Sequence, residues 1–321
     1  MLKKDRRDLE DIVIRDEKHG LPYSKGLMAS SLMATGISPT DAYKVARDIE
    51  GYLRKRDTVS IRVKELQDLA AKTLKREMGE RFAERYVKWQ SLGKLDKPLI
   101  IMIGGTTGVG KSSIATEIAH RLGITRIVST DALREVMRAI FTKELMPSLY
   151  GSSFNAWRGL NTPLPREADS LIVGFQEQTK AVSVAVRAVI ERGIREGLSL
   201  VVEGVHMVPG FINLSKIRAF VVSLVITVEN EDLHRSHFYI RKLETGGLRR
   251  LEKYRANFEN IRRLGTYIES LALEKKTPII SSDNWDYTVS AVFEEILRKV
   301  IAPNQEAKMQ KVSLKSKDTA L

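Results

Sequence analysis

Hydrophobic and polar positions follow two different patterns in the chain, and the change lies near residue 98. Before it, apolar residues recur every three or four positions, which is typical of amphipathic helices. The pattern predicts four helices, over residues 24–35, 38–54, 61–77 and 79–91. Ser38 or Thr40 is suited to cap the second helix, because a hydroxyl accepts a hydrogen bond from a free backbone N–H at a helix start. Residues 1–93 are therefore predicted to form a small, mainly helical domain.

From residue 99 onward, apolar residues instead form short continuous runs that alternate with amphipathic stretches. Such runs are typical of strands that are buried on both faces of a parallel sheet. The predicted strands are residues 99–103, 126–129, 198–203, 220–228 and 278–281. Alternating strands and helices predict an α/β domain over residues 98–303, with a parallel sheet flanked by helices. A polar linker over residues 91–98 precedes it, and residues 304–321, which include few apolar side chains, are predicted to form a mobile tail.

The loop after the first predicted strand has the sequence Gly-Thr-Thr-Gly-Val-Gly-Lys-Ser (residues 105–112), which matches the phosphate-binding pattern G-x-x-x-x-G-K-[ST]. Its glycines allow backbone N–H groups to curl around an anion, and the next helix adds the positive end of its dipole. Lys111 is expected to reach the β- and γ-phosphates, and Ser112 to offer its hydroxyl to Mg²⁺. The predicted nucleotide-binding residues are Gly105, Thr106, Thr107, Gly108, Val109, Gly110, Lys111, Ser112 and Ser113.

A carboxylate and two arginines follow the second predicted strand, where ligands bind in open α/β sheets. Asp131 is placed to accept a proton from an attacking hydroxyl, or to orient that hydroxyl. Arg134 and Arg138 fall on the same helical face as Asp131, and two forked cations suit an acceptor that is itself anionic. The alternative is that Asp131 or Thr130 caps a helix and that both arginines are solvated.

Two further candidates follow the third predicted strand. Glu203 closes the strand and is expected to hold Mg²⁺ directly or through water, although it could be an ordinary charge at a strand end. His206 is a candidate for binding a phosphate or carboxylate of the acceptor, or it is an ordinary loop histidine. No N-K-x-D pattern follows the fourth strand, which favours ATP over GTP.

Basic residues are concentrated after the fourth predicted strand, around two glycines at positions 246 and 247. Arg235, Arg241 and Arg250 are predicted to form a lid that neutralises the charge on the transferring phosphoryl group and excludes water. The alternative is a solvated basic face or a nucleic-acid-binding patch.

The composition narrows these possibilities. The chain has 321 residues, a net charge of +13 from 53 basic and 40 acidic side chains, and no cysteine, which excludes disulfides and cysteine nucleophiles. It contains no apolar stretch of membrane-spanning length and no apolar signal segment near its start, so we expect a cytoplasmic protein without a membrane partner. A positive field suits small anionic substrates. Nucleic acid is disfavoured as a partner because no recognised binding motif accompanies the charge.

Taken together, the motifs resemble those of the archaeal 2-phosphoglycerate kinases, P-loop kinases with an N-terminal ATP-cone-like domain. The resemblance extends over residues 9–301 and implies the reaction ATP + 2-phosphoglycerate → ADP + 2,3-bisphosphoglycerate. The family also implies supply of the precursor of cyclic 2,3-bisphosphoglycerate, a compatible solute of methanogens and related thermophilic archaea, and hence a link to thermoadaptation. The residues that carry the resemblance are Ile103-Gly-Gly-Thr-Thr-Gly-Val-Gly-Lys-Ser-Ser113, Ser129-Thr-Asp-Ala-Leu-Arg-Glu-Val-Met-Arg138, Val202-Glu-Gly-Val-His-Met-Val-Pro209 and the stretch 234–242.

In the resulting mechanism, Lys111, Asp131, Glu203 and Arg241 are the predicted catalytic residues. Two rivals stay open: a kinase of another small anionic alcohol, and an ATP-switched, nucleic-acid-binding NTPase. The ATP-cone motifs are incomplete, with a basic pair reduced to Ile14-Arg15 and a leucine, Leu27, where the family's second motif has lysine. For this domain, regulatory nucleotide binding and a purely structural role are therefore both open.

Overall fold

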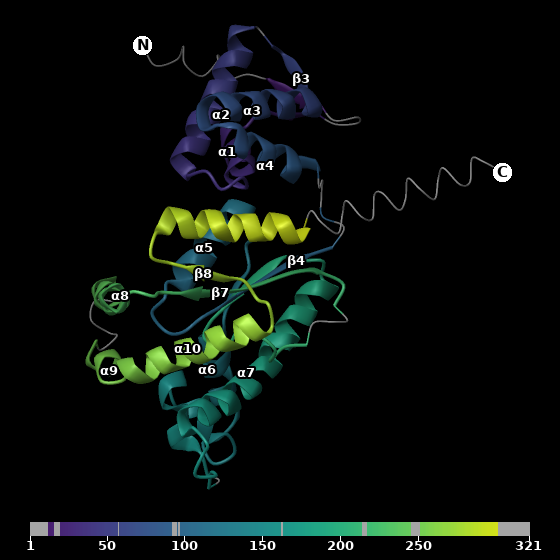
Figure 1. The fold of residues 1–321 in the computed structure, drawn as a ribbon. Coiled ribbons are helices and arrows are strands. Elements are labelled where there is room, and N and C mark those ends of the chain that lie inside the picture. Colours follow the sequence, from purple (N-terminus) through teal and green to yellow (C-terminus); the bar gives the residue numbers. More distant parts are fainter. Residues whose placement is uncertain are drawn as a thin grey trace, which may run out of the picture. The chain divides into compact units, whose positions relative to one another are not determined.

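The computed structural model describes residues 12–15, 20–56, 58–91, 95, 97–161, 163–213, 217–244 and 251–300. The chain divides into two compact units: among the described residues, the first comprises those up to Ser91 together with Arg121–Gly123, and the second comprises those of Leu95–His120 and Ile124–Val300. Figure 1 shows the helices and strands of both units. Half of the predicted linker, the tail over residues 304–321, the two lid glycines and Arg250 lie outside the described residues.

Among its described residues, the first unit contains four helices and a small sheet. The helices are α1 (Lys25–Met33), α2 (Pro39–Lys55), α3 (Val63–Met78) and α4 (Glu80–Ser91). The strands are β1 (Val13–Arg15), β2 (Gly20–Pro22) and β3 (Ser60–Arg62), in the order β2-β1-β3. The sequence pattern placed residue 61 in a helix, but it lies in β3. The helix starts later because the Glu65 carboxylate accepts a hydrogen bond from the backbone N–H of Arg62.

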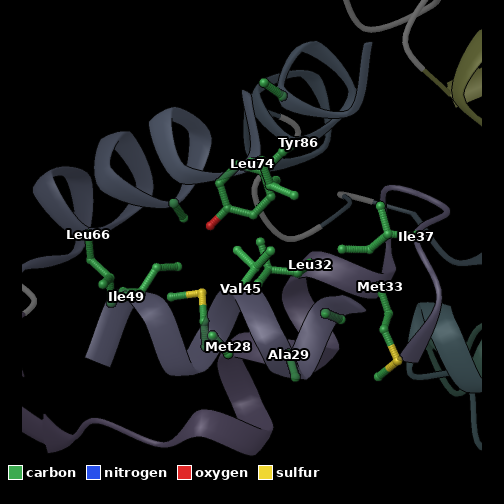
Figure 2. Close-up of a cluster of buried hydrophobic side chains, with 14 of the residues drawn as sticks. Met28, Ala29, Leu32, Met33, Ile37, Val45, Ile49, Leu66, Leu74 and Tyr86 are labelled. Atoms are coloured by element: carbon green, nitrogen blue, oxygen red, sulfur yellow. The ribbon is translucent and has the colours of Figure 1, made fainter. Parts of the chain in front are cut away.

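The helices of this unit enclose a core of their own (Figure 2). Leu32, Ile49 and Leu74 are fully buried in it, and the ring of Tyr86 packs among them. Ser38 is the N-cap of α2, since its hydroxyl accepts a hydrogen bond from the backbone N–H of Asp41 at 3.1 Å. The apolar face that the sequence pattern identified is thus the face that these helices bury.

The second unit is built on a five-stranded sheet with the order β5-β6-β4-β7-β8. Every neighbouring pair is parallel. The predicted α/β fold with a parallel sheet is confirmed, and all five predicted strands are present. The strands are β4 (Leu99–Gly104), β5 (Ile127–Ser129), β6 (Leu200–Glu203), β7 (Phe220–Thr227) and β8 (Ile279–Ser281). Because β4 is central and buried along its whole length, its carboxyl end opens at the middle of the sheet edge.

Helices cover both faces of this sheet, as Figure 1 shows. On one face lie α5 (Lys111–Leu122) and a helix over residues 285–300; on the other lie α7 (Ser170–Arg195) and α10 (Phe258–Glu274). Val182 and Val186 of α7 pack with Ile100 of β4 in one buried cluster. The remaining elements are α6 (Thr130–Ile140), the 3₁₀ turns η2 (Pro147–Tyr150) and η3 (Ser153–Gly159), α8 (Glu231–Glu244) and α9 (Leu251–Arg255). Within the described part of the chain, no helix is long and apolar enough to span a membrane.

Candidate active site

The phosphate-binding loop occupies the turn between β4 and α5. Gly105, Gly108 and Gly110 have φ angles of 130°, 91° and 84°, a region that residues with a side chain rarely adopt. A Cβ on Gly105 would lie 2.2 Å from the carbonyl oxygen of Ile226 in β7, so the loop also runs too close to the neighbouring strand for any side chain there. The glycines of the motif therefore permit a backbone conformation that other residue types rarely adopt.

Lys111 is folded back onto this loop. Its ammonium group donates a hydrogen bond of 2.6 Å to the carbonyl oxygen of Thr106, and the residue is only 8% exposed. Burial lowers the pKa of Lys111, and the carboxylates of Glu203 and Asp131 oppose that shift. These two carboxylates follow different strands. The sheet therefore brings three of the predicted catalytic groups, Lys111, Glu203 and Asp131, close enough to interact electrostatically.

Ser112 and Glu203 form a pair beside the lysine. The Ser112 hydroxyl donates to Oε1 of Glu203 at 3.1 Å, and Glu203 is only 6% exposed at the end of β6. One hydroxyl and one carboxylate are the oxygen ligands that Mg²⁺ takes when nucleotide phosphates and water complete its coordination. The described residues contain no group of three or more His, Asp or Glu side chains that could hold a metal alone. The donor set therefore fits an ion that is shared with a nucleotide.

The predicted acceptor residues lie together on the first turns of α6. Nε of Arg134 is 4.0 Å from Oδ1 of Asp131, whose side chain is 66% exposed. Ser129 is the N-cap of α6, without a side-chain hydrogen bond, so neither Asp131 nor Thr130 occupies the cap position. Both arginines are paired with one carboxylate that sequence reasoning missed: Glu135 accepts hydrogen bonds from Arg134 at 2.7 Å and from Arg138 at 2.9 and 2.7 Å.

Arg134 is held in place by backbone groups as well. Its Nη1 donates to the carbonyl oxygens of Leu149 and Gly151 at 2.7 and 2.9 Å. Arg138 lies against the ring of Tyr150, 4.9 Å from its centroid. The long insertion between β5 and β6 thus supports both arginines, and the forked heads of both are directed to the same exposed carboxylate.

His206 lies in the interior behind these residues and is fully buried. The amide nitrogen of Gln178 donates to the carbonyl oxygens of Ser148 and Gly151, so its oxygen faces Nε2 of His206 at 2.9 Å. Nε2 therefore carries the proton, and Nδ1 accepts from the hydroxyl of Thr130 at 3.0 Å. Burial lowers the pKa of His206 to about 4, which keeps the ring neutral. Both ring nitrogens are thus hydrogen-bonded to buried side chains, and through Thr130 the histidine is connected to the first residue of α6.

The predicted lid residues begin on α8, which follows β7. The guanidinium of Arg235 stacks on the ring of Phe258, 3.7 Å from its centroid, and lies 3.7 Å from Glu231. Arg241 is half-buried on the same helix. Arg250 lies outside the described residues.

The sequence interpretation gave no role to two histidines of α8 that bind the loop itself. Nε2 of His234 is 2.8 Å from the carbonyl oxygen of Thr107, and Nδ1 of His237 is 2.9 Å from that of Gly108. The signal available in the sequence was their spacing of three residues on a helix, which places both on one face. What that face contacts depends on tertiary structure.

In the first unit, the segments that resemble the two ATP-cone motifs contribute the cations Arg15 and, two positions before Leu27, Lys25, and their surroundings differ. Lys25 is 3.1 Å from Glu50 on α2, whereas Arg15 is exposed at the end of β1. Although partial burial opposes the shift, hydrogen bonds from Lys25 and Arg54 lower the pKa of Glu50. Regulatory nucleotide binding and a purely structural role both stay open for this unit.

A glycine-rich loop between the central strand of a five-stranded parallel sheet and a helix, with the strand order β5-β6-β4-β7-β8, defines a P-loop enzyme of the kinase type. The sequence is 39% identical over 289 residues to the 2-phosphoglycerate kinase of Methanothermobacter thermautotrophicus, which covers 90% of this chain and 94% of that protein. The 2-phosphoglycerate kinase of Methanopyrus kandleri is 38% identical over 298 residues (92% and 90%), and that of Thermococcus kodakarensis is 38% identical over 291 residues (90% and 98%). The chain belongs to the 2-phosphoglycerate kinase family.

Two other comparisons add nothing to this assignment. No family model matches the chain. Among solved structures, a shikimate kinase from Acinetobacter baumannii in complex with shikimate covers 67% of this chain at a TM-score of 0.37 and 18% identity, which is too distant a likeness to bear on fold or function.

Proposed function

We propose that this chain transfers the γ-phosphoryl group of ATP to the 3-hydroxyl of 2-phosphoglycerate, giving ADP and 2,3-bisphosphoglycerate. One observation carries the proposal: the residues that suit nucleotide, metal and acceptor follow three adjacent parallel strands. The phosphate loop follows β4, Glu203 closes β6, and Asp131 follows β5. The relatives of this chain bear the name of the same reaction.

On the nucleotide side, the backbone N–H groups of the loop bind the phosphates together with Lys111. The lysine exchanges its contact with the Thr106 carbonyl for the β- and γ-phosphates. Ser112 and Glu203 would hold Mg²⁺, which would supply positive charge to neutralise those phosphates. Because Glu203 is buried and already bonded to Ser112, these oxygens need little rearrangement.

On the acceptor side, Asp131 orients the 3-hydroxyl for in-line attack. A bond forms between the hydroxyl oxygen and the γ-phosphorus, while the bond from that phosphorus to the β–γ bridging oxygen breaks and ADP leaves with the electron pair. The hydroxyl proton passes to Asp131. The phosphate and carboxylate of 2-phosphoglycerate replace Glu135 as partners of Arg134 and Arg138.

The segment after β7 completes the site. Arg235, Arg241 and Arg250 neutralise the transferring group and exclude water, which would otherwise intercept it. His206 supports the acceptor side from within, through Thr130. The product, 2,3-bisphosphoglycerate, is the compound from which a cyclic 2,3-bisphosphoglycerate would be made.

An acceptor panel with γ-labelled ATP tests the proposal. We expect label in 2,3-bisphosphoglycerate when 2-phosphoglycerate is supplied, and at most weak labelling with 3-phosphoglycerate or glycerate. Transfer to another phosphorylated three-carbon acid, with none to 2-phosphoglycerate, would establish the rival small-molecule kinase. ATP hydrolysis that needs no acceptor and is stimulated by nucleic acid in a salt-sensitive manner would establish the rival NTPase.

A further inference from the structure

The carbonyl groups of the phosphate loop are bound from outside by side chains of other elements. The carbonyl of Thr107 accepts from His234, that of Gly108 accepts from His237, and that of Val109 accepts from the hydroxyl of Ser282 at 2.8 Å. The two histidines come from α8, and the serine follows β8. The outer surface of the loop is therefore held from two separate elements.

These contacts fix the direction of the groups that face the phosphates. In a trans peptide the C=O of one residue and the N–H of the next point in opposite directions. The carbonyls of Thr107 and Gly108 therefore belong to the same peptide planes as the N–H groups of Gly108 and Val109. A donor that holds each carbonyl outward turns the corresponding N–H inward, where a P-loop binds phosphate.

The fit between α8 and the loop is close. A Cβ on Gly108 would lie 2.5 Å from the ring of Phe238 and 2.9 Å from Nε2 of His234. The rings of His234 and Phe238 stack with centroids 5.2 Å apart, and both residues are buried. Because the helix and the loop are in van der Waals contact as well as hydrogen-bonded, a displacement of α8 would be transmitted to the loop.

The chemistry of His234 indicates a donor rather than a packing role. A carbonyl oxygen only accepts, so Nε2 must carry the proton. Burial lowers the pKa of His234 to about 4, so the ring is neutral and Nδ1 is unprotonated. Nδ1 is buried without a hydrogen-bond partner among the described residues, a cost that an apolar side chain of similar size would avoid. What the imidazole contributes at this position is the hydrogen bond to Thr107.

We propose that His234 and His237 are positioning residues that orient the Gly108 and Val109 N–H groups toward the nucleotide and couple the phosphate loop to α8. Helix α8 also bears Arg235 and Arg241. The same helix therefore positions two of the lid arginines and determines how tightly the loop binds the nucleotide phosphates. This inference rests on the nucleotide-binding part of the proposed function and is independent of the acceptor.

Two pairs of variants test the proposal. His234→Gln and His237→Asn keep a donor nitrogen near the position of the original one, whereas His234→Leu and His237→Leu remove it. Ser236→Ala is the matched control, because Ser236 is exposed on the same helix and its hydroxyl donates to the carbonyl of Asp232 on that helix. The readouts are the dissociation constant of MgATP by calorimetry without acceptor, the thermal unfolding midpoint, and the KM for 2-phosphoglycerate.

Each leucine variant is expected to weaken MgATP binding about tenfold, which corresponds to about 1.4 kcal/mol. The glutamine and asparagine variants should recover most of that loss, Ser236→Ala should bind as the wild type, and the KM for 2-phosphoglycerate should not change. Leucine variants that melt at lower temperature but bind MgATP normally would overturn the proposal, as would amide variants that recover nothing.

The outcomes separate this proposal from the proposed function. If MgATP affinity follows the pattern above while the wild type transfers nothing to 2-phosphoglycerate, the positioning role stands and the acceptor assignment fails. If His234→Leu does not fold, the half-buried His237 decides alone through its leucine and asparagine variants.

Discussion

The two halves of the proposed active site are built differently. On the nucleotide side, Lys111 and Glu203 are buried, and the loop is bonded to neighbouring elements. On the acceptor side, Asp131 and Glu135 are exposed, with 66% and 53% of their side chains accessible, and the arginines are paired with a carboxylate of their own helix. In the proposed function the nucleotide side is therefore preorganised, whereas the acceptor side would have to exchange partners in order to bind an anion.

The largest effect is expected from a substitution of Lys111 in the nucleotide half. Lys111→Ala removes the cation that would meet the β- and γ-phosphates, so kcat/KM should fall by about two to three orders of magnitude. The fold should be retained, because burial already disfavours the charged amine. ADP release measured with a coupled assay, together with thermal unfolding, checks this. The matched control is Lys72→Ala, an exposed lysine of α3, which should leave the rate unchanged. Near-normal turnover in Lys111→Ala would contradict the assignment.

Glu203 tests whether the buried pair holds the metal. Glu203→Gln keeps an acceptor for the Ser112 hydroxyl but loses the charge, so kcat should fall about a hundredfold and half-saturation by Mg²⁺ should need about ten times more metal. A titration of the rate with MgCl₂ at saturating ATP measures both quantities. An unchanged metal requirement with a reduced rate would assign Glu203 to a different role.

Arg138 is the cleaner probe of the acceptor half, because its side chain, unlike that of Arg134, donates to no backbone carbonyl among the contacts described above. Arg138→Ala should raise the KM for 2-phosphoglycerate about tenfold or more, the effect of losing a charged hydrogen bond, and leave MgATP affinity unchanged. Initial rates at varied acceptor measure it. Arg187→Ala, another arginine in a helical pair, with Glu191 at 2.8 Å, is the matched control. A loss of MgATP affinity in Arg138→Ala would contradict the assignment of Arg138 to the acceptor half alone.

A substitution of Glu135 also tests the acceptor half, but it is expected to change the KM for 2-phosphoglycerate in the opposite direction. If Glu135 competes with the substrate for both arginines, Glu135→Gln should lower the KM for 2-phosphoglycerate by about two- to fivefold, the range expected for an exposed ion pair. The same initial-rate measurement decides. A higher KM would instead mean that Glu135 holds the arginines in their binding positions.

The last prediction concerns the stability of the fold rather than catalysis. The native pKa of His206 is about 4, below the value of about 6.5 for an unfolded histidine. Between these values the unfolded state binds more protons, so the free energy of unfolding falls as the pH is lowered from 6.5 toward 4. At pH 5 this contribution is on the order of 2 kcal/mol. Unfolding midpoints at pH 7 and pH 5 should therefore differ less in His206→Gln than in the wild type, while His120→Gln, at an exposed histidine, should match the wild type. Equal differences in all three proteins would contradict the buried, neutral state of His206.

The sequence predicted those parts of the molecule that depend on local patterns. The five parallel strands were recognisable because buried strands are continuous apolar runs, and the loop because its glycines have a conformational requirement that is local to the turn. Helix starts were less well placed: a helix was expected from residue 61, but α3 begins at Val63, because the Glu65 carboxylate accepts a hydrogen bond from the backbone N–H of Arg62. Where several neighbouring residues could cap a helix, the backbone geometry decides which of them does so, and the sequence pattern does not show it.

The contacts that were not predicted connect residues far apart in the chain or choose between competing partners. His234 meets a carbonyl 127 residues away, and His206 meets Gln178 in the interior. The small sheet of the first unit depends on pairing between β1 and β3, whose short strands show no pattern of their own. Spacing placed Arg134 and Arg138 on one face, but it could not show that Glu135 would pair with both.

The most direct test of the central claim is to follow the conversion of ATP and 2-phosphoglycerate by ³¹P NMR with the full-length protein and Mg²⁺. The account predicts that the two phosphate signals of 2,3-bisphosphoglycerate grow in equal proportion to ADP, and that neither grows with Lys111→Ala. Formation of ADP and inorganic phosphate without 2,3-bisphosphoglycerate, or no reaction with 2-phosphoglycerate, would contradict it.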